Sequence, residues 1–282
     1  MGYAPNPKAV KSAGWEDDIG RREEMEDGWV FIDCYGEHPS SCYFAIYDGH
    51  GGRQCVEYVQ EHLHKNLLLE LEKAPSNVPE AMMQAFELTD DNMQCSGISS
   101  SGCTACSCLL RQESAYAERV LYTAHVGDAR AVLCRQGLAV RLTGESDHKA
   151  TDPEEAKRVV EAGGTIYNER VNGMLAISRA FGDFQLKAPT WTKDIVSNVP
   201  EISATLLMEN DLFVITACDG LWDVLEDQEA VNLVIEGIEQ LGILCEESAG
   251  HPMLGQVVAR LLIEEALARG TSDNVTCVVV FP

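Results

Sequence analysis

Apolar positions along the chain follow two kinds of pattern. Short runs rich in β-branched and aromatic residues predict strands, which cover residues 29–35, 42–47, 103–110, 120–126, 130–135, 202–207, 212–217 and 275–281. Apolar residues at helical spacing predict helices over about 56–71, 79–93, 153–162, 228–240 and 254–269. The third helix has a clear start, with Asp152 as the cap, Pro153 in the first turn and Glu155 three residues after the cap.

Short polar loops separate two pairs of neighbouring strands. Residues 36–41 turn the strand at 29–35 back onto the strand at 42–47, which predicts a hairpin. The strands at 202–207 and 212–217 predict a second hairpin. The first pairing would place the residues just before Trp29 beside those just after Tyr47.

Three other segments carry little pattern. Residues 1–14 fit an arm or a first edge strand, and the charged segment 16–27, taken alone, is typical of a solvated loop. Periodicity fades again over about 170–198. Long irregular segments within compact domains are usually functional or mobile, so this last one is a candidate for either.

The length of 282 residues fits one domain, since no linker-like run divides residues 1–282. Hydrophobic residues make up 45% of the chain, but no apolar run reaches the roughly 18 residues that span a bilayer. Residues 1–6 show no core of a signal peptide, and Asn6 stands where a myristoylation signal has Ser or Thr. We therefore expect a protein of the cytoplasm, the nucleus or both, not associated with membranes.

Charge and cysteine content restrict the partners and the compartment. Acidic residues number 45 against 21 basic ones, and a net charge of −24 repels nucleic acids and anionic membranes. The eleven cysteines are scattered, and several stand within apolar strand-like runs. We expect them to be reduced core residues, because no secretion signal and no paired Cys-x-x-Cys spacing indicates disulfides or zinc.

Acidic residues recur at the ends of the predicted strands. Asp48 and Asp219 each follow a strand and are each followed by glycine, while Asp27 and Asp273 stand just before strands. Further acids stand beside or between strand ends, namely Glu26, Asp128 and Asp223. If pairing gathers these ends, the carboxylates repel one another unless cations lie between them.

The residue types indicate which cations and which chemistry. Oxygen ligands without histidine pairs or thiolates favour Mg²⁺ or Mn²⁺ over Zn²⁺, and Gly49 can turn its carbonyl toward an ion. Two ions sharing a carboxylate would acidify a water for attack on phosphorus. Arg22 is the candidate for holding phosphate oxygens, and His50 for protonating the leaving oxygen.

Other signals are weaker. The remaining histidines are expected at the surface or in the core, namely His38, His62, His64, His125, His148 and His251. The sequence contains no P-loop, His-Glu-x-x-His, EF-hand or Gly-x-Ser-x-Gly pattern that would indicate a competing mechanism.

Seven motifs in order along nearly the whole chain resemble those of the metal-dependent protein serine/threonine phosphatases of type 2C. They are Arg22-x-x-Met-Glu-Asp27, Tyr47-Asp-Gly-His-Gly-Gly52, Val126-Gly-Asp-Ala-Arg130, Asp147-His-Lys149, Val171-Asn-Gly-x-Leu-Ala-x-Ser-Arg-Ala-x-Gly-Asp183, Cys218-Asp-Gly-Leu-Trp-Asp223 and Ser272-Asp-Asn-Val-Thr276. The resemblance implies an α+β fold, a β-sandwich of two mostly antiparallel sheets flanked by helices on both sides. It implies a monomer acting on phosphoprotein substrates.

The resemblance also implies roles for the acidic residues. Asp48 would bridge two Mn²⁺ or Mg²⁺ ions, Asp219 and Asp273 would hold one, and Glu26 with the Gly49 carbonyl would hold the other. By the same motifs, Asp27 would support a metal-bound water, Arg22 would grip the phosphate and His50 would be the general acid. Asp128 and Asp223 would join Asp219 at a weaker third ion, and the irregular segment at about 170–198 would be a flap beside the site.

Three functions are compatible with these residues. The first is hydrolysis of phosphoserine and phosphothreonine in proteins by a water activated by two metal ions. The second is a catalytically inactive scaffold, which the presence of all the implied ligands disfavours. The third is hydrolysis of small phosphates, which the same residues also allow.

Overall fold

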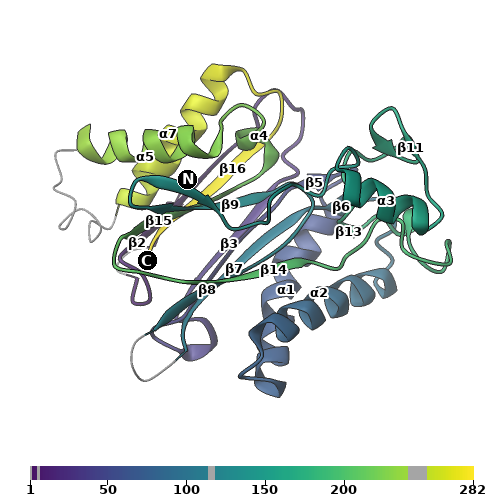
Figure 1. Cartoon of the computed structure of the whole chain (residues 1–282), viewed down its shortest axis with the longest axis horizontal. Coiled ribbons are helices and arrows are strands. Elements are labelled where there is room, and N and C mark those ends of the chain that lie inside the picture. The colour runs from purple at the N-terminus through teal and green to yellow at the C-terminus, as the bar shows by residue number, and fades with distance from the viewer. Residues whose placement is uncertain (1, 5–6, 114–117, 241–252) are drawn as a thin grey trace.

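Two antiparallel sheets lie face to face at the centre of the structure, a computed structural model that describes residues 2–4, 7–113, 118–240 and 253–282 (Figure 1). The six-stranded sheet consists, in spatial order, of β1 (Gly2–Tyr3), β2 (Ser12–Asp18), β16 (Val275–Phe281), β15 (Asp211–Ala217), β9 (Arg130–Arg135) and β10 (Leu138–Arg141). The five-stranded sheet consists of β14 (Glu201–Leu206), β8 (Arg119–Val126), β7 (Ala105–Gln112), β4 (Cys42–Tyr47) and β3 (Gly28–Asp33).

Helices cover the outer face of each sheet. The long helices α1 (Gln54–Lys73) and α2 (Val78–Cys95) pack on the five-stranded sheet, and α5 (Asp227–Gln240) and α7 (Leu254–Arg269) pack on the six-stranded sheet. Figure 1 shows the two pairs on opposite sides of the sandwich. The order helix, sheet, sheet, helix is the predicted α+β sandwich, and the prediction of this fold class is confirmed.

Strand β4 shows why the central strands read as continuous apolar runs. Tyr43, Ala45 and Tyr47 face α1 and α2, whereas Phe44 and Ile46 face the other sheet. Both faces of the strand are therefore buried, so its sequence does not alternate between apolar and polar residues. The same double burial removes all of β16 from solvent.

The predicted first hairpin is confirmed, and the predicted second hairpin is wrong. Strand β3 pairs with β4 as expected. Strand β14, however, pairs with β8 in one sheet, and β15 pairs with β16 and β9 in the other. Asp211 anchors this change of sheet, because its buried carboxylate accepts hydrogen bonds from Arg135 and from the backbone of Met208.

The charged N-terminal segment is also more ordered than a solvated loop. Strand β2 includes Glu16, Asp17 and Asp18, and it lies inside the six-stranded sheet, between β1 and β16. Glu16 is 9% exposed. Pairing with the C-terminal strand, which is remote in sequence, fixes this segment as a strand despite its acidic composition.

The segment at 170–198 is irregular, as predicted. Its regular pieces are short: β12 (Arg170–Val171), β13 (Phe181–Gly182) and the 3₁₀ turn η2 (Phe184–Leu186). It packs against α3 (Pro153–Glu161) in a small apolar cluster of its own, and β11 (Ile166–Tyr167) pairs with β12. Strand β13 joins β6 (Gly102–Cys103) and β5 (Gly49–His50) in a small third sheet.

Two sequence predictions concern the state of the cysteines and the absence of membrane-spanning segments. The ten cysteines in the described residues are all free, and eight of them are buried, as expected of reduced core residues. Within the same residues, no helix has the length and apolar composition that crossing a bilayer requires. His251, predicted to be an ordinary surface or core residue, lies outside the described residues.

Candidate metal centre

Three carboxylates from different parts of the sandwich meet in one group. Asp48 follows β4, Asp128 lies between β8 and β9, and Asp219 opens the short helix α4 (Asp219–Trp222) after β15. One oxygen from each lies within 4.8 Å of the others. Because β4 and β15 belong to different sheets, this group forms where the strand ends of both sheets come together.

A second group shares Asp48 with the first. The pairing of Gly28 with Tyr47 in the β3–β4 hairpin sets Asp27 beside Asp48, and the Cys218 thiol completes the group within 4.8 Å. Asp27 is 3% exposed and accepts a 2.6 Å hydrogen bond from Thr276. Asp48 is therefore the carboxylate around which both groups form.

Burial and repulsion set the protonation of these acids. Burial and, to a smaller extent, the charges of Asp128 and Asp223 raise the pKa of Asp219 to about 8. Burial raises the pKa of Asp27 to about 6, against the opposing hydrogen bonds from Thr276 and Cys218. The pKa of Asp48 rises well above its ordinary value through burial and the charge of Asp219. Without a cation, the centre would therefore hold protons at neutral pH.

Glu26 and Gly49 lie at the glycine-rich turn that follows β4. The Glu26 carboxylate accepts a 2.5 Å hydrogen bond from the backbone of Gly52, and it belongs to neither group of converging ligands among the described residues. Gly49 fits because a Cβ there would lie 2.4 Å from the backbone oxygen of Glu26. Only glycine allows this close approach of two backbones.

Arg22 and Asp273 form an ion pair at the rim. The Arg22 guanidinium lies 2.6 Å from the Asp273 carboxylate, and the two side chains are 54% and 33% exposed. Asp273 is also outside the two converging groups of the described residues, although its charge raises the pKa of Asp27, Asp48 and Asp219. Since exposed ion pairs contribute little free energy, Arg22 can exchange this partner for another anion.

Lys149 links two of the predicted third-ion residues, a contact that the sequence analysis did not find. Its ammonium lies 3.2 Å from Asp223 and 3.6 Å from Asp128. Burial lowers the pKa of Lys149, but the charges of Asp128 and Asp223 outweigh that effect and raise it. The position of Lys149 in the Asp147-His-Lys149 motif was the available signal, but the motif does not indicate what the lysine contacts.

Asp183 is a second residue that the sequence analysis gave no role. Asp183 is 1% exposed, and its carboxylate lies 2.8 Å from Nε2 of His50. Burial lowers the pKa of His50, but the hydrogen bond and charge of Asp183 outweigh that effect, so the pKa is raised. Asp183 thereby favours a protonated His50, which is the form a general acid needs.

The residues present fit a hard divalent cation. Asp48, Asp128 and Asp219 offer only oxygen atoms, and among the described residues neither Asp48 nor Asp219 has an ion pair with a basic side chain. Carboxylates that are largely shielded from water and lack such partners require a cation or a proton. Oxygen donors of this kind select Mg²⁺ or Mn²⁺. The individual ligand assignments remain predictions.

A cavity of about 390 Å³ lies away from this centre. It is lined by the β3–β4 connection, the end of α1 and strand β7, including Tyr35, Leu68 and Arg111. None of the carboxylates described above lines it. The chemistry therefore belongs to the strand ends and not to this cavity.

Comparison with known proteins identifies the family. Residues 17–275 match the family described as Protein phosphatase 2C. The chain is 38% identical over 284 residues to Protein phosphatase 2C homolog 1 of Schizosaccharomyces pombe, covering 98% of this chain and 75% of the relative. It is 36% identical to Protein phosphatase 2C homolog 1 of Saccharomyces cerevisiae, covering 92% and 89%. The chain belongs to the protein phosphatase 2C family.

Solved structures agree on the fold. The serine-threonine phosphatase 2C from Toxoplasma gondii superposes with a TM-score of 0.76 over 99% of this chain and 98% of that one, at 21% identity. A sex determining protein of C. elegans superposes with a TM-score of 0.79 over 95% and 64%, at 27% identity. The protein is thus an enzyme of a metal-dependent family, a protein serine/threonine phosphatase, with acidic groups suited to metal binding.

Proposed function

We propose that this protein hydrolyses phosphoserine and phosphothreonine in other proteins in a single in-line step, with two divalent ions at the carboxylate centre. The observation that carries the proposal is the convergence of Asp48, Asp128 and Asp219 within 4.8 Å. Asp128 is buried, and Asp48 and Asp219 are half-buried and have no ion pair among the described residues. Membership of the phosphatase family supports the same reaction.

The carboxylates would divide between the two ions. Asp48 would be shared, Asp219 and Asp273 would hold one ion, and Glu26 with the Gly49 carbonyl would hold the other. Two Mn²⁺ or Mg²⁺ ions bound there would acidify a water and neutralise phosphate charge. Asp128 and Asp223 would complete a weaker third site with Asp219, in exchange for their contacts with Lys149.

Arg22 binds the substrate phosphate in this proposal. Its guanidinium is half exposed at the rim and is held only by Asp273 among the described carboxylates. A phosphate carries more charge than one carboxylate and presents two oxygens to the planar guanidinium, so it can replace Asp273. Arg22 therefore orients the phosphorus toward the attacking water.

His50 supplies the proton that the leaving group needs. The attacking water loses one proton to solvent, and its oxygen bonds to phosphorus while the bond from phosphorus to the serine or threonine oxygen breaks. That oxygen takes a proton from the imidazolium, which becomes neutral. Asp183, 2.8 Å from Nε2, keeps the ring protonated and oriented. Asp27 accepts a hydrogen bond from Thr276, which holds its carboxylate in place to accept one from the water.

Metal removal tests this proposal. After exhaustive chelation, hydrolysis of an aryl phosphate and of a phosphothreonine peptide should fall by at least about a hundredfold, because the ions supply several kcal/mol of stabilisation. Added Mn²⁺ or Mg²⁺ should restore both rates. Full activity without metal would contradict the mechanism.

The same assay separates the alternatives. A protein phosphatase should prefer the phosphothreonine peptide to small phosphates by kcat/KM, whereas a small-molecule phosphohydrolase should show the reverse order. A protein that binds the peptide but releases no phosphate in the presence of either metal would be a scaffold.

A further inference from the structure

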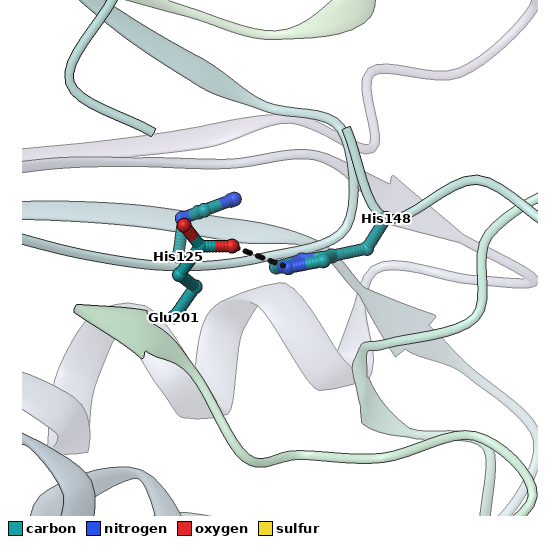
Figure 2. A group of neighbouring side chains, drawn as sticks. All are labelled: His125, His148 and Glu201. Carbon is teal, nitrogen blue, oxygen red and sulfur yellow. Dashed lines mark ion pairs between the residues drawn. The ribbon is translucent and has the colours of Figure 1, made fainter. Parts of the chain in front are cut away.

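A second set of ligand-type side chains lies outside the carboxylate centre. It consists of His125 on β8, His148 in the connection after β10, and Glu201 on β14 (Figure 2). His125 and Glu201 are direct partners across the two strands, and the backbone of His148 bonds to the oxygen of Gly127. One ligand atom from each of the three side chains lies within 4.8 Å of the others.

The two imidazoles are buried and lack hydrogen bonds. His125 is 2% exposed and His148 is 3% exposed. In the part of the chain that the structure describes, Nε2 of His125 and both ring nitrogens of His148 have no hydrogen-bond partner. A neutral imidazole always carries one N–H, so at least one buried donor on His148 is unsatisfied. A buried N–H donor without a hydrogen-bond partner ordinarily destabilises a fold, so its presence here requires an explanation.

Glu201 gives the pair both charge and access to solvent. Its carboxylate lies 3.5 Å from Nε2 of His148, at the outer limit of hydrogen-bond distance, and its side chain is 47% exposed. The His125 ring also has a hydrogen bond with the backbone of Glu201. A histidine that binds a metal typically uses its other nitrogen in this way, which fixes the ring and directs its free lone pair.

Both rings are in the form that metals bind. Burial lowers the pKa of His148 to about 2 and that of His125 to about 4, and nearby positive charge adds to both effects. The charged groups that face the pair balance in number: Arg130, Arg158 and Arg179 against Asp147, Glu155 and Glu201. A neutral imidazole in neutral surroundings releases no proton when it binds a cation.

We propose that His125, His148 and Glu201 form a binding site for one Zn²⁺ ion, separate from the carboxylate centre. Two imidazoles and one carboxylate are a common zinc ligand set, with a water in the fourth position. Hard Mg²⁺ prefers oxygen ligands, so the two sites differ in the metals they select.

The present geometry defines the movement that binding needs. The rings stack with centroids 4.3 Å apart and planes 11° apart, so their lone pairs point in parallel and not toward one point. Rotation of one ring about its Cβ–Cγ bond would make them converge. The ligand atoms would then approach from within 4.8 Å to the spacing of about 3.3 Å that a tetrahedral zinc site has.

The site would fasten the connection that carries Lys149 to the sheet. His148 directly precedes Lys149, which contacts Asp128 and Asp223, and Lys149 also forms a β-bridge with Ile177 of the flap. A metal held by His148 would thus restrain both the lysine and the base of the flap. The zinc site does not depend on the proposed catalytic mechanism.

Metal titration in the presence of excess Mg²⁺, which occupies the carboxylate centre, tests the proposal. Wild-type protein should bind one equivalent of Zn²⁺, and Co²⁺ used as a probe should give the intense visible bands of tetrahedral nitrogen and oxygen coordination. H148Q should weaken Zn²⁺ binding by at least about a hundredfold and E201Q by at least about tenfold. Loss of a residue that only supports a metal ligand typically lowers metal affinity by about 10- to 100-fold, and loss of a ligand itself should cost at least as much. H62Q, which removes a histidine on α1 outside the cluster, should bind as the wild type does.

The variants keep the proposal falsifiable if a buried histidine cannot be replaced. Glu201 is half exposed, so E201Q should fold even if H148Q does not. Equal Zn²⁺ affinity in the wild type and E201Q, an octahedral Co²⁺ spectrum, or a thiolate charge-transfer band would each overturn the assignment. This test measures Zn²⁺ affinity and the Co²⁺ spectrum, whereas the catalytic proposal is tested by phosphatase activity. Failure of one proposal is therefore distinguishable from failure of the other.

Discussion

The carboxyl groups of Glu155 and Asp219, both shielded from solvent to a large extent, have opposite electrostatics. Glu155, 6% exposed, accepts hydrogen bonds from Arg179 at 2.6 Å, Ser178 at 2.6 Å and Arg158 at 3.0 Å. Burial raises its pKa, but these partners outweigh burial and lower it to about 2. Asp219 has no ion pair among the described residues; the charges of Asp128, Asp223 and Asp273 add to the effect of burial, and its pKa rises to about 8.

The difference separates structural acids from functional ones. The protein itself satisfies Glu155, so that carboxylate stabilises the packing of α3 on the flap. Asp219 is left for something that the chain does not contain, and a divalent cation satisfies it. Burial raises the pKa of both carboxyl groups, so burial alone does not distinguish them. The charged and hydrogen-bonding side chains around each group decide whether its pKa ends below or above the ordinary value.

Replacement of Asp219 gives the largest expected effect. Asp219→Asn should lower kcat/KM by at least about a hundredfold, because a ligand of a catalytic cation is lost. The metal-free variant should be at least as stable as the metal-free wild type, since repulsion with Asp128 and Asp223 is removed. Steady-state kinetics and thermal unfolding measure the two quantities. Glu226→Gln, an exposed acid near α4, is the charge-matched control and should retain activity.

A folded Asp219→Asn variant with wild-type turnover would show that the unpaired acid is not a functional ligand. A metal-free variant less stable than the wild type would show that Asp219 has a structural role like that of Glu155.

Replacement of Glu155 should act on stability. Glu155→Gln leaves Arg179 and Arg158 without their carboxylate and should lower the free energy of unfolding by about 3 kcal/mol. Glu154→Gln, at the exposed neighbouring position on α3, should change it by less than about 0.5 kcal/mol. Urea unfolding monitored by circular dichroism measures both. Equal stabilities of the two variants would contradict the structural role of Glu155.

The pH dependence of stability should have opposite signs for the two acids. The pKa of Asp219 in the folded, metal-free protein is about 8, above its ordinary value of 3.8, so the folded state holds the extra proton. Stability from this group is present at low pH and is lost as the pH rises toward 8. The folded pKa of Glu155, about 2, lies below its ordinary 4.5, so its contribution is lost as the pH falls from about 4.5 to 2.

Unfolding in chelator between pH 7.5 and 8.5 isolates the first effect, because the buried histidines and Glu155 are then largely deprotonated in both the folded and the unfolded state. Stability should fall with rising pH, by at most about 1.4 kcal/mol per pH unit for each carboxyl group that keeps its proton only in the folded state. The fall should be smaller in Asp219→Asn and in protein saturated with Mg²⁺. A stability that rises over this range without metal would contradict the unpaired state of the centre.

Local sequence was enough to predict most elements and the acids at their ends. Strands that are buried on both faces, such as β4 and β16, have continuous apolar runs that can be recognised in the sequence without a structure. The β3–β4 hairpin and the α3 cap at Asp152 also depend on neighbours in sequence, and both are confirmed. The motifs were sufficient to indicate the family.

Long-range pairing was not predictable in the same way. The pattern of β14 and β15 is the same whether the two pair together or join different sheets, so the hairpin prediction failed there. The acidic strand β2 was missed because its partner, β16, lies at the other end of the chain. His125 and His148 were each read as ordinary histidines, and only their contact in space makes them a candidate site.

The sequence by itself determined most of the strands and helices, the family motifs and the carboxylates at strand ends. The tertiary structure decided which strands share a sheet, and which buried groups have partners: Glu155 has arginines, Asp219 has other acids, and His148 has an unsatisfied ring. The physical reason is one of range. Strand and helix patterns arise between residues a few positions apart, whereas the charge and hydrogen bonding of a buried group depend on residues that folding alone brings together.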